Sequence, residues 1–396
     1  MSTNPSLSLA VIGAGPVGLS LALHAARVLP DARISLFDAR PADKDVASDA
    51  RTIALSLGSV QLLQRLSAWN ADAATRITEV HVSQQPPSLP SVLAGWLGEP
   101  EVRIRAFDEA VPMLGAVLGY GAIVGPLQQA WMAAVEKEPQ RLVARFATTV
   151  GALKPVAGGV EVDAGIAERH DLAVIAEGGV YNEQVRKTVS HDYRQSAWVG
   201  TVKLATPRPG VAYERFTRHG PAALLPLPGG RAGLVWCVAR DDDPVAELSD
   251  AQRLAVLNTL FHPEVGPLAE VSPLKAFPLG LNAERTLTDG RTVRIGNAAQ
   301  TLHPVAGQGL NLGLRDAFEL VRALSRSRDL DAVLRRLEWK RGPDRWAIIA
   351  ATDFLARSFT WTLPGAGAAR GLGMAALQAF RPAKSALARQ MMFGQR

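Results

Sequence analysis

Short apolar runs alternate with glycine-containing loops near the start of the chain. Residues 7–12 and 34–37 are apolar runs of strand length, and the segment that begins at Pro16 stays apolar through Leu23. Proline suits the first turn of a helix, because the amide hydrogen that it lacks is not needed there. The pattern therefore predicts a strand–helix–strand unit over residues 7–40.

The pattern changes twice further along the chain. Residues 141–176 alternate in the manner of strands and end in the apolar run 172–176. Other strands are predicted at residues 77–82, 212–216, 222–225, 232–238 and 292–295, and helices near residues 60–66 and 128–137. Residues 85–100, rich in proline and glycine, are predicted to form a loop, and residues 310–396 are mainly helical in character. This order predicts an α/β chain with an antiparallel region inserted between two strand–helix regions.

The turn after the first strand carries a specific glycine pattern. Gly13, Gly15 and Gly18 fit G-x-G-x-x-G, and Asp38 follows the second strand twenty residues after Gly18. The glycines allow a tight turn, close approach of a pyrophosphate and close helix–strand packing, and the carboxylate can bond a ribose hydroxyl. The sequence therefore predicts a dinucleotide-binding, Rossmann-like domain, against the alternative of a plain glycine-rich turn.

A second loop of this kind lies at residues 296–309. It follows the strand predicted at 292–295, contains Pro304, Gly307 and Gly309, and leads into a helix near Leu310. Free backbone N–H groups and the positive end of a helix dipole can stabilise negative charge on a ligand. Two such loops in one chain suggest a ligand held from two sides.

Composition narrows the class of protein. The 396 residues carry a net charge of +6 and one cysteine, Cys237. One cysteine excludes a disulfide framework and a cysteine-based zinc site, and favours a reducing compartment. The basic balance suits a basic enzyme or an anionic membrane surface, because no nucleic-acid motif and no long Lys/Arg block is present. The apolar start reads as strand, turn and helix rather than as a signal peptide, and no run of eighteen apolar residues predicts a spanning helix.

Several segments together carry a resemblance that runs nearly end to end. They are Gly13–Gly18, Asp49-Ala50-Arg51-Thr52-Ile53-Ala54-Leu55, Glu214-Arg215-Phe216-Thr217-Arg218-His219-Gly220-Pro221, Gly233-Leu234-Val235-Trp236-Cys237 and Gly296–Asp316. The chain resembles the flavoprotein aromatic hydroxylases of the para-hydroxybenzoate hydroxylase class, and within them the ubiquinone-biosynthesis hydroxylases. The run from Gly296 to Pro304 is typical of that subgroup, whereas many related flavoproteins have Gly-Asp in place of Gly296-Asn297.

The resemblance implies FAD as the dinucleotide and a set of residues that hold it. Gly13, Gly15 and Gly18 would bind its pyrophosphate, Asp38 its ribose, and Arg51 would reach the cofactor. The second loop would line the isoalloxazine ring through Gly296, Pro304, Gly307, Gln308, Gly309, Leu310 and Asn311. The implied fold has a discontinuous FAD-binding domain (1–76, 103–182 and 284–340), an inserted antiparallel substrate domain (77–102 and 183–283) and a helical C-terminus (341–396).

The implied reaction is hydroxylation of the aromatic ring of a polyprenylated phenol, of the 2-polyprenyl-6-methoxyphenol type, in ubiquinone biosynthesis. Reduced FAD would react with O₂ to give a flavin C4a-hydroperoxide, with NAD(P)H as a transient reductant. His303, next to Pro304, is a candidate base or a structural hydrogen-bond partner. Ala176-Glu177-Gly178 replaces the usual Ala-Asp-Gly, and Pro126 stands near a usual cofactor contact. Two alternatives stay open: a hydroxylase of a soluble aromatic compound, and a non-catalytic FAD-binding scaffold of a biosynthetic complex.

The C-terminal tail, residues 347–393, is apolar with scattered cations. Leu372, Ala376 and Phe380 follow a helical spacing, and Arg370 and Arg381 accompany them. The tail is either a helix pair packed on the FAD domain or a surface for a membrane or for other ubiquinone-biosynthesis proteins. We therefore expect a cytoplasmic protein, with a possible peripheral contact at the inner face of the cytoplasmic membrane.

Overall fold

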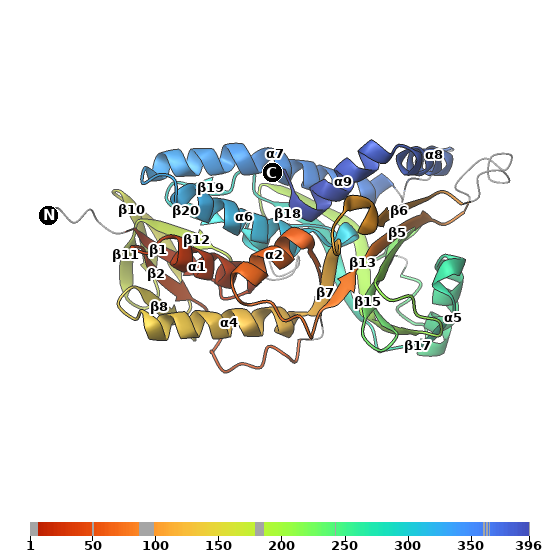
Figure 1. Ribbon diagram of the computed structural model, residues 1–396, viewed down its shortest axis with the longest axis horizontal. Coiled ribbons are helices and arrows are strands. Elements are labelled where there is room, and N and C mark those ends of the chain that lie inside the picture. The colour runs from red at the N-terminus through yellow and green to blue at the C-terminus, as the bar shows by residue number, and fades with distance from the viewer. Residues whose placement is uncertain are drawn as a thin grey trace.

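The computed structural model describes residues 7–49, 51–86, 99–178, 186–241, 243–358, 361, 363 and 365–395. Two large sheets lie in the two halves of the molecule along its long axis (Figure 1). The long helix α7, Leu330–Ser358, runs along one side. The strand–helix–strand unit predicted for residues 7–40 is present as β1 Ser8–Ile12, α1 Pro16–Val28 and β2 Arg33–Phe37.

The first sheet is mainly parallel and has the strand order β19-β20-β12-β1-β2-β8. Besides β1 and β2, its strands are β8 Leu142–Arg145, β12 Leu172–Ile175, β19 Thr288–Asp289 and β20 Thr292–Arg294, with β19 and β8 at the two edges. Alternate residues of β1 face opposite sides: Leu9 and Val11 pack in the large core with the helices, whereas Ala10 and Ile12 pack against Val160. Val160 belongs to a small sheet formed by β9 Ala152–Val156, β10 Gly159–Asp163 and β11 Ala167–His170.

Helices α1 and α6 (Gly309–Leu324) pack closely near their starts. A β-carbon at Gly313 would lie 2.7 Å from the Cα atom of Gly296 and 2.9 Å from Cγ2 of Val17. Gly296 has φ of +61° and also packs against Val17. Because side chains at positions 313 and 296 would separate the helices, the two glycines bring the first turn of α1 against the second turn of α6.

The second sheet has the order β21-β18-β13-β16-β15-β14-β5-β6, with β17 paired to β13. Its strands are β5 Glu79–Gln84, β6 Glu101–Arg105, β13 Val189–Leu204, β14 Val211–Thr217, β15 Gly220–Leu227, β16 Arg231–Ala239, β17 Leu268–Val271, β18 Lys275–Ala283 and β21 Gln300–Thr301. All pairs are antiparallel except β14 with β5. Helix α5, Asp250–Leu260, packs on one face with Leu234, Trp236 and Tyr213. The other face is directed toward the second glycine loop.

Shorter elements connect the two sheets. Strands β3 Thr52–Ser56, β7 Gly115–Gly119 and β4 Thr75–Ile77 form a three-stranded sheet. Along the chain, helix α2 Leu57–Arg65 follows β3 and helix α4 Tyr120–Lys137 follows β7. Four short 3₁₀ turns lie at Phe107–Glu109, Pro263–Val265, Gly296–Ala298 and Val305–Gly307 among the described residues. Much of the loop predicted at residues 85–100 lies outside the described residues.

The C-terminal segment is helical, with α7, α8 Ala366–Ala379 and α9 Arg381–Phe393. The boundary expected at residue 340 falls inside α7, which continues through Pro343 to Ser358. Arg341 is buried there and donates to Asp316 of α6 at 2.7 Å and to Asp344 at 2.5 Å, so α6 and α7 are joined by buried charge. No helix in the described part of the chain is long and apolar enough to cross a bilayer. The division into domains stays a proposal; the sheet memberships above support its discontinuous character.

Candidate functional site

The first glycine loop lies at the carboxyl end of β1. Gly13 has φ of +104°, and a β-carbon there would lie 2.7 Å from the backbone nitrogen of Glu177. A β-carbon at Gly18 would lie 1.9 Å from the carbonyl oxygen of Gly13. Gly15 is different, because the nearest atom to a β-carbon added there would be Tyr120 Oη, at 3.9 Å. Gly13 and Gly18 therefore serve the turn itself, whereas Gly15 leaves open space in front of α1, whose first turn has no side-chain cap.

Asp38 and Arg40 flank this open space. The backbone N–H groups of Ala14 and Arg40 donate to the Asp38 carboxylate, which places that carboxylate directly beside the loop. Arg40 donates to the carbonyl oxygen of Ala14 at 3.3 Å and to Gln128 at 2.9 Å, while its Nη1 atom is buried without a partner. A buried guanidinium nitrogen without an acceptor is costly. An anionic group in front of Gly15 would satisfy it.

Sequence reasoning missed Arg40. The available signal was its spacing: two residues after Asp38, just past the end of β2, it can lie on the same side of the chain as that carboxylate. Arg51 was predicted, and it reaches the same region from β3. Its guanidinium carbon lies 4.3 Å from the centroid of the Tyr120 ring, the side chain nearest to Gly15. Arg51 also hydrogen-bonds Asp49 at 2.6 Å, which lowers the pKa of that carboxyl.

The second glycine loop ends at the start of α6, which also has no side-chain cap and no acidic residue in its first turn. Gly307 has φ of +58°, and Gly309 would meet no atom within 4 Å if it carried a β-carbon. Gln308 is 8% exposed and Leu310 is half-buried. The free N–H groups of this helix start can receive negative charge from a ligand.

The Asn311 side chain holds the loop and does not face a ligand. Its amide nitrogen donates to the carbonyl oxygens of Ala54 and Gly307 at 3.0 and 2.8 Å. Its oxygen accepts from Ser56 N at 2.8 Å and Ser59 Oγ at 2.7 Å. These four bonds use the full capacity of the amide. Asn311 thus contributes by fixing the start of α6 to β3, and Gly296, which packs behind the loop on Val17, contributes in the same indirect way.

His303 is engaged in the protein structure through both ring nitrogens. Nδ1 accepts the backbone N–H of Val305 at 3.2 Å, so Nε2 carries the proton that bonds Gln195 Oε1 at 3.0 Å. The ring is 2% exposed, and this burial lowers the pKa of His303 to about 3. A neutral histidine with both nitrogens used favours the structural role over the catalytic one. Pro304 precedes the 3₁₀ turn and accepts from Gly307 N at 2.9 Å.

The second glycine loop also contacts the open face of the nine-stranded sheet. His303 is bonded to Gln195 of β13, and Val305 packs with Phe216 of β14, Val82 and Leu355. At the other end of this face, a β-carbon at Gly233 would lie 2.7 Å from Thr52 Oγ1 of β3. The face between these contacts is lined by Ala197, Val235 and Cys237. The second glycine loop thus lies against a largely apolar sheet surface.

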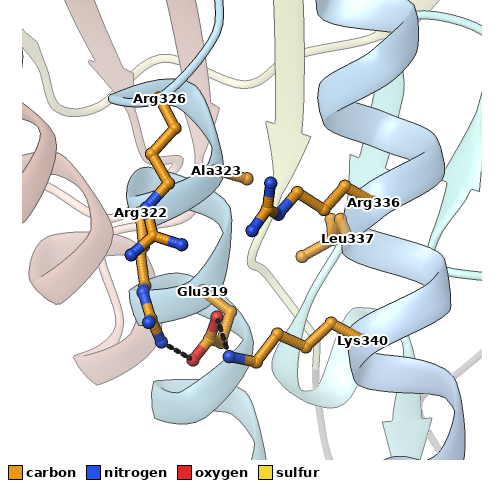
Figure 2. Close-up of a pocket in the computed structure, with 7 residues that line it drawn as sticks. All are labelled: Glu319, Arg322, Ala323, Arg326, Arg336, Leu337 and Lys340. Carbon is orange, nitrogen blue, oxygen red and sulfur yellow. Dashed lines mark hydrogen bonds and ion pairs between the residues drawn. The ribbon is translucent and has the colours of Figure 1, made fainter.

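Two other clusters do not fit a cofactor. The cleft of Figure 2, between α6 and α7, has room for about one water molecule. There Glu319 is already paired with Arg322 at 3.2 Å and Lys340 at 3.3 Å. His81, His262 and Glu264 also come together, but hydrogen bonds from Arg103 and then Arg208 lower the pKa of Glu264 to about 2. Arginine thus compensates that carboxylate without a metal ion.

The residues present fit FAD. An uncapped helix start, the open position at Gly15 and the orphan N–H of Arg40 suit a pyrophosphate, and Asp38 suits a ribose hydroxyl. The second uncapped helix start, at Gly309, suits the negative edge of a reduced flavin. These cofactor assignments stay a proposal, and they lead to the two predictions below.

Gly15→Val and Gly18→Ala are expected to fail in different ways. Gly15 has φ of −78° and free space, so valine should leave the apoprotein stable but block the pyrophosphate and abolish FAD binding. Alanine at position 18 would overlap a backbone oxygen and should cost about 1–3 kcal/mol of folding free energy. Flavin content and chemical denaturation of the apoproteins measure both effects. Normal flavin content in Gly15→Val would contradict the assignment.

His303→Ala should destabilise the protein by about 1–3 kcal/mol, since Gln195 and the Val305 N–H lose their partner. The folded-state pKa is about 3 and the unfolded value 6.5, so the unfolded chain takes up a proton that folded His303 refuses. The loss should therefore be largest above pH 6.5 and shrink as the pH falls toward 3. Denaturation of both proteins across this range checks it. A loss of hydroxylation with stability unchanged would instead support the catalytic role.

Comparison with known proteins places the chain in a family. A family model described as FAD binding domain matches residues 164–339. The chain is 30% identical to the 3-demethoxyubiquinol 3-hydroxylase of Escherichia coli over 95% of its own length and 96% of the relative. It is 28% identical to the ubiquinone hydroxylase UbiL of Rhodospirillum rubrum, over 96% of this chain and 88% of that protein.

Solved structures agree on the fold. The crystal structure of p-nitrophenol 4-monooxygenase PnpA from Pseudomonas putida superposes with a TM-score of 0.72 at 16% identity, covering 99% of each chain. That of Klebsiella pneumoniae HpxO complexed with FAD and uric acid gives 0.71 at 14% identity, covering 98% of this chain and 97% of that one. The predicted α/β fold with a helical C-terminus is confirmed, and the chain belongs to the family of FAD-dependent hydroxylases of ubiquinone biosynthesis.

Proposed function

We propose that this FAD-dependent monooxygenase hydroxylates the aromatic ring of a polyprenylated phenol, of the 2-polyprenyl-6-methoxyphenol type. The names of the E. coli and R. rubrum relatives support a substrate from ubiquinone biosynthesis. The observation that carries the proposal is the pairing of two uncapped helix starts, α1 and α6, with an apolar sheet face beside the second. An apolar, mostly water-free surface next to a flavin suits an aromatic ring with a hydrocarbon tail.

Each part of the chain has its own task in this proposal. FAD, reduced by a transiently bound NAD(P)H, supplies the activation of O₂. The first loop and Arg40 hold the anionic pyrophosphate, and the start of α6 favours negative charge at the flavin edge. Phe216 and Val305 pack together between the loop and the sheet, which excludes water from that side of the site.

A soluble aromatic substrate is the second candidate. The structural relatives named for p-nitrophenol and uric acid support it, because both of those compounds are small and lack a long hydrocarbon tail. A scaffold that binds FAD without turnover is the third, supported by Glu177 in place of the usual aspartate. Desolvation by burial, followed by the nearby Asp38 carboxylate, raises the pKa of the Glu177 carboxyl.

Turnover with matched phenols separates these functions. The purified holoenzyme would be given isotopically labelled O₂, NADH or NADPH, and either 2-methoxyphenol or its 6-prenylated derivative. We expect one labelled oxygen in the prenylated product and reductant oxidation that depends on that phenol. Equal turnover of 2-methoxyphenol would favour the soluble substrate. Bound FAD without any phenol-stimulated oxidation of NAD(P)H would contradict catalysis and favour the scaffold.

We further propose that the end of α7 together with α8 and α9 contacts an anionic lipid surface. Phe354, Trp361 and Leu363 are 57%, 49% and 67% exposed, and the first two rings lie 6.1 Å apart. Phe380 is 61% exposed at the α8–α9 junction, close in sequence to the exposed Arg381. Exposed aromatic rings accompanied by cations are typical of interfacial contact with anionic lipid. Helix α8 also lies toward one end of the molecule in Figure 1.

Trp361→Ser should reduce co-sedimentation with vesicles that contain phosphatidylglycerol, because it removes an aromatic ring from the contact. Trp339→Ser is the matched control: Trp339 is 81% exposed but lies toward the opposite end of α7. We expect the control to bind like the wild type, and the wild type to bind less at high salt. Equal binding of Trp361→Ser and Trp339→Ser would contradict the proposed surface.

A further inference from the structure

Strand β14 contains a carboxyl, that of Glu214, for which the described neighbouring residues provide no partner. Six of the seven residues from Val211 to Thr217 are buried, and Glu214 is the residue that keeps part of its surface accessible. Side chains alternate between the two faces of a strand. Tyr213 and Arg215 are directed to the face that carries α5, where Tyr213 packs with Leu257 and Arg215 donates to the carbonyl oxygen of Leu260 at 3.2 Å. Glu214 is therefore directed to the opposite face, toward the second glycine loop.

Strand pairing defines the surroundings of Glu214 on that face. Its direct neighbours are Val82 on β5 and Ala223 on β15, and Ala223 is in turn paired with Val235 of β16. Phe216, two residues further along β14, packs on Val305 of the loop. Two residues of a strand span about 7 Å. The carboxyl thus lies one same-face step from the point where the glycine loop touches the sheet.

Glu214 is half-buried and has no partner in the part of the protein that the structure describes. Among the described residues no hydrogen bond or ion pair reaches its carboxyl, and burial raises the pKa of Glu214 to about 8. Burial, and in second place the Glu214 carboxyl, raises the pKa of Cys237, a thiol of β16 on the same face of the sheet. The other titratable groups on this side, His303, Tyr193 and Asp353, are engaged elsewhere, His303 with Gln195 and Tyr193 with Asp353 at 3.0 Å. Lys275, at the start of β18, is exposed at the sheet's edge.

A carboxyl that is largely desolvated and has no partner is costly, and such groups concentrate at functional sites. The apolar neighbours Val82, Ala223 and Val235 cannot satisfy it. A ligand hydroxyl can, and the face of the sheet on which Glu214 lies is the one that the proposed function assigns to an aromatic ring.

We propose that Glu214 binds the ring hydroxyl of the phenolic substrate and takes its proton during hydroxylation. This inference rests on the proposed function and deepens it, because it names the residue that positions and activates the ring. The hydroxyl proton moves to the carboxylate oxygen, and the phenolate that remains donates electron density to the ring carbon that is oxygenated. O₂ is the oxidant and NAD(P)H the reductant: the O–O bond breaks, one oxygen atom forms the new C–O bond of the ring, and the other leaves as water. When the ring regains its aromatic character by losing the C–H proton to solvent, the carboxyl returns its proton to the phenolate oxygen.

The test compares wild type, Glu214→Gln, Glu214→Leu and the control Tyr213→Phe, a conservative change on the opposite face of the same strand. Flavin content and thermal melting first establish that each variant folds and holds FAD. Binding of 2-methoxy-6-prenylphenol is followed by the change in the flavin absorption spectrum, and kcat and KM are measured across neutral and alkaline pH. Glutamine can still hydrogen-bond the hydroxyl but cannot accept its proton.

We expect Glu214→Gln to bind the phenol within a few-fold of wild type, with kcat lowered by about 100-fold. The wild-type kcat/KM should rise with pH through an ionisation near 8, because the carboxylate is the active form, and the glutamine variant should lack this rise. Glu214→Leu should weaken phenol binding itself, and Tyr213→Phe should behave like wild type.

Unchanged kcat and pH dependence in Glu214→Gln would overturn the proton-transfer role, and unchanged binding in Glu214→Leu would overturn the contact. If the wild type binds the phenol without hydroxylating it, the proposed function fails while the binding data still decide the contact. If the wild type does not bind the phenol at all, both proposals fail.

Discussion

The close contact between α1 and α6 determines how the rest of the site is arranged. Gly313 and Gly296 have no side chains, so Val17 of α1 packs directly on the backbones of both glycines. Each helix start is uncapped, and each follows a glycine loop. Because the helices meet near their starts, we propose that the two sets of free N–H groups contact one ligand. A dinucleotide that bridges two uncapped helices matches this geometry.

The second glycine loop joins the cofactor side to the substrate side. Asn311 fixes the start of α6 to β3, His303 bonds Gln195 of β13, and Val305 packs on Phe216 of β14. The contacts of Asn311 and His303 are polar, whereas that of Val305 with Phe216 is apolar and buried. A rigid loop of this kind can keep a flavin at a constant distance from the sheet face on which Glu214 lies.

Buried charged groups are paired in some parts of the molecule and lack a partner in others. Between α6 and α7, Arg341 is paired with Asp316 and Asp344, which joins the C-terminal helices to the FAD side. Around His81, Arg103 and Arg208 neutralise Glu264. Glu214 has no such compensation, and Arg40 keeps one orphan nitrogen. Paired charges hold the fold together, whereas the orphan nitrogen of Arg40 and the carboxyl of Glu214 lie where we propose the cofactor and the substrate.

The sequence alone determined the local elements that depend on short-range physics. The glycine spacing at Gly13–Gly18 predicts a turn that only residues without a β-carbon allow, and the structure has that turn. The helix starts and most strands were predicted for the same reason, because the alternation of apolar residues has the period of each element. Strand β13 and helix α5 were both missed, although the capping box of Ser249 and Gln252 is a local signal for the start of α5.

Tertiary structure alone decided which side chains meet. Asn311 and His303 looked like site residues in the sequence, but hydrogen bonds from segments more than a hundred residues away occupy their polar atoms. The sequence did not single out Arg40 or Glu214 as site residues, yet the fold leaves one guanidinium nitrogen of Arg40 and the carboxyl of Glu214 without partners among the described residues. Hydrogen bonding and desolvation depend on atoms that are distant in sequence, so the residue type is set by the chain and its chemical role by the packing around it.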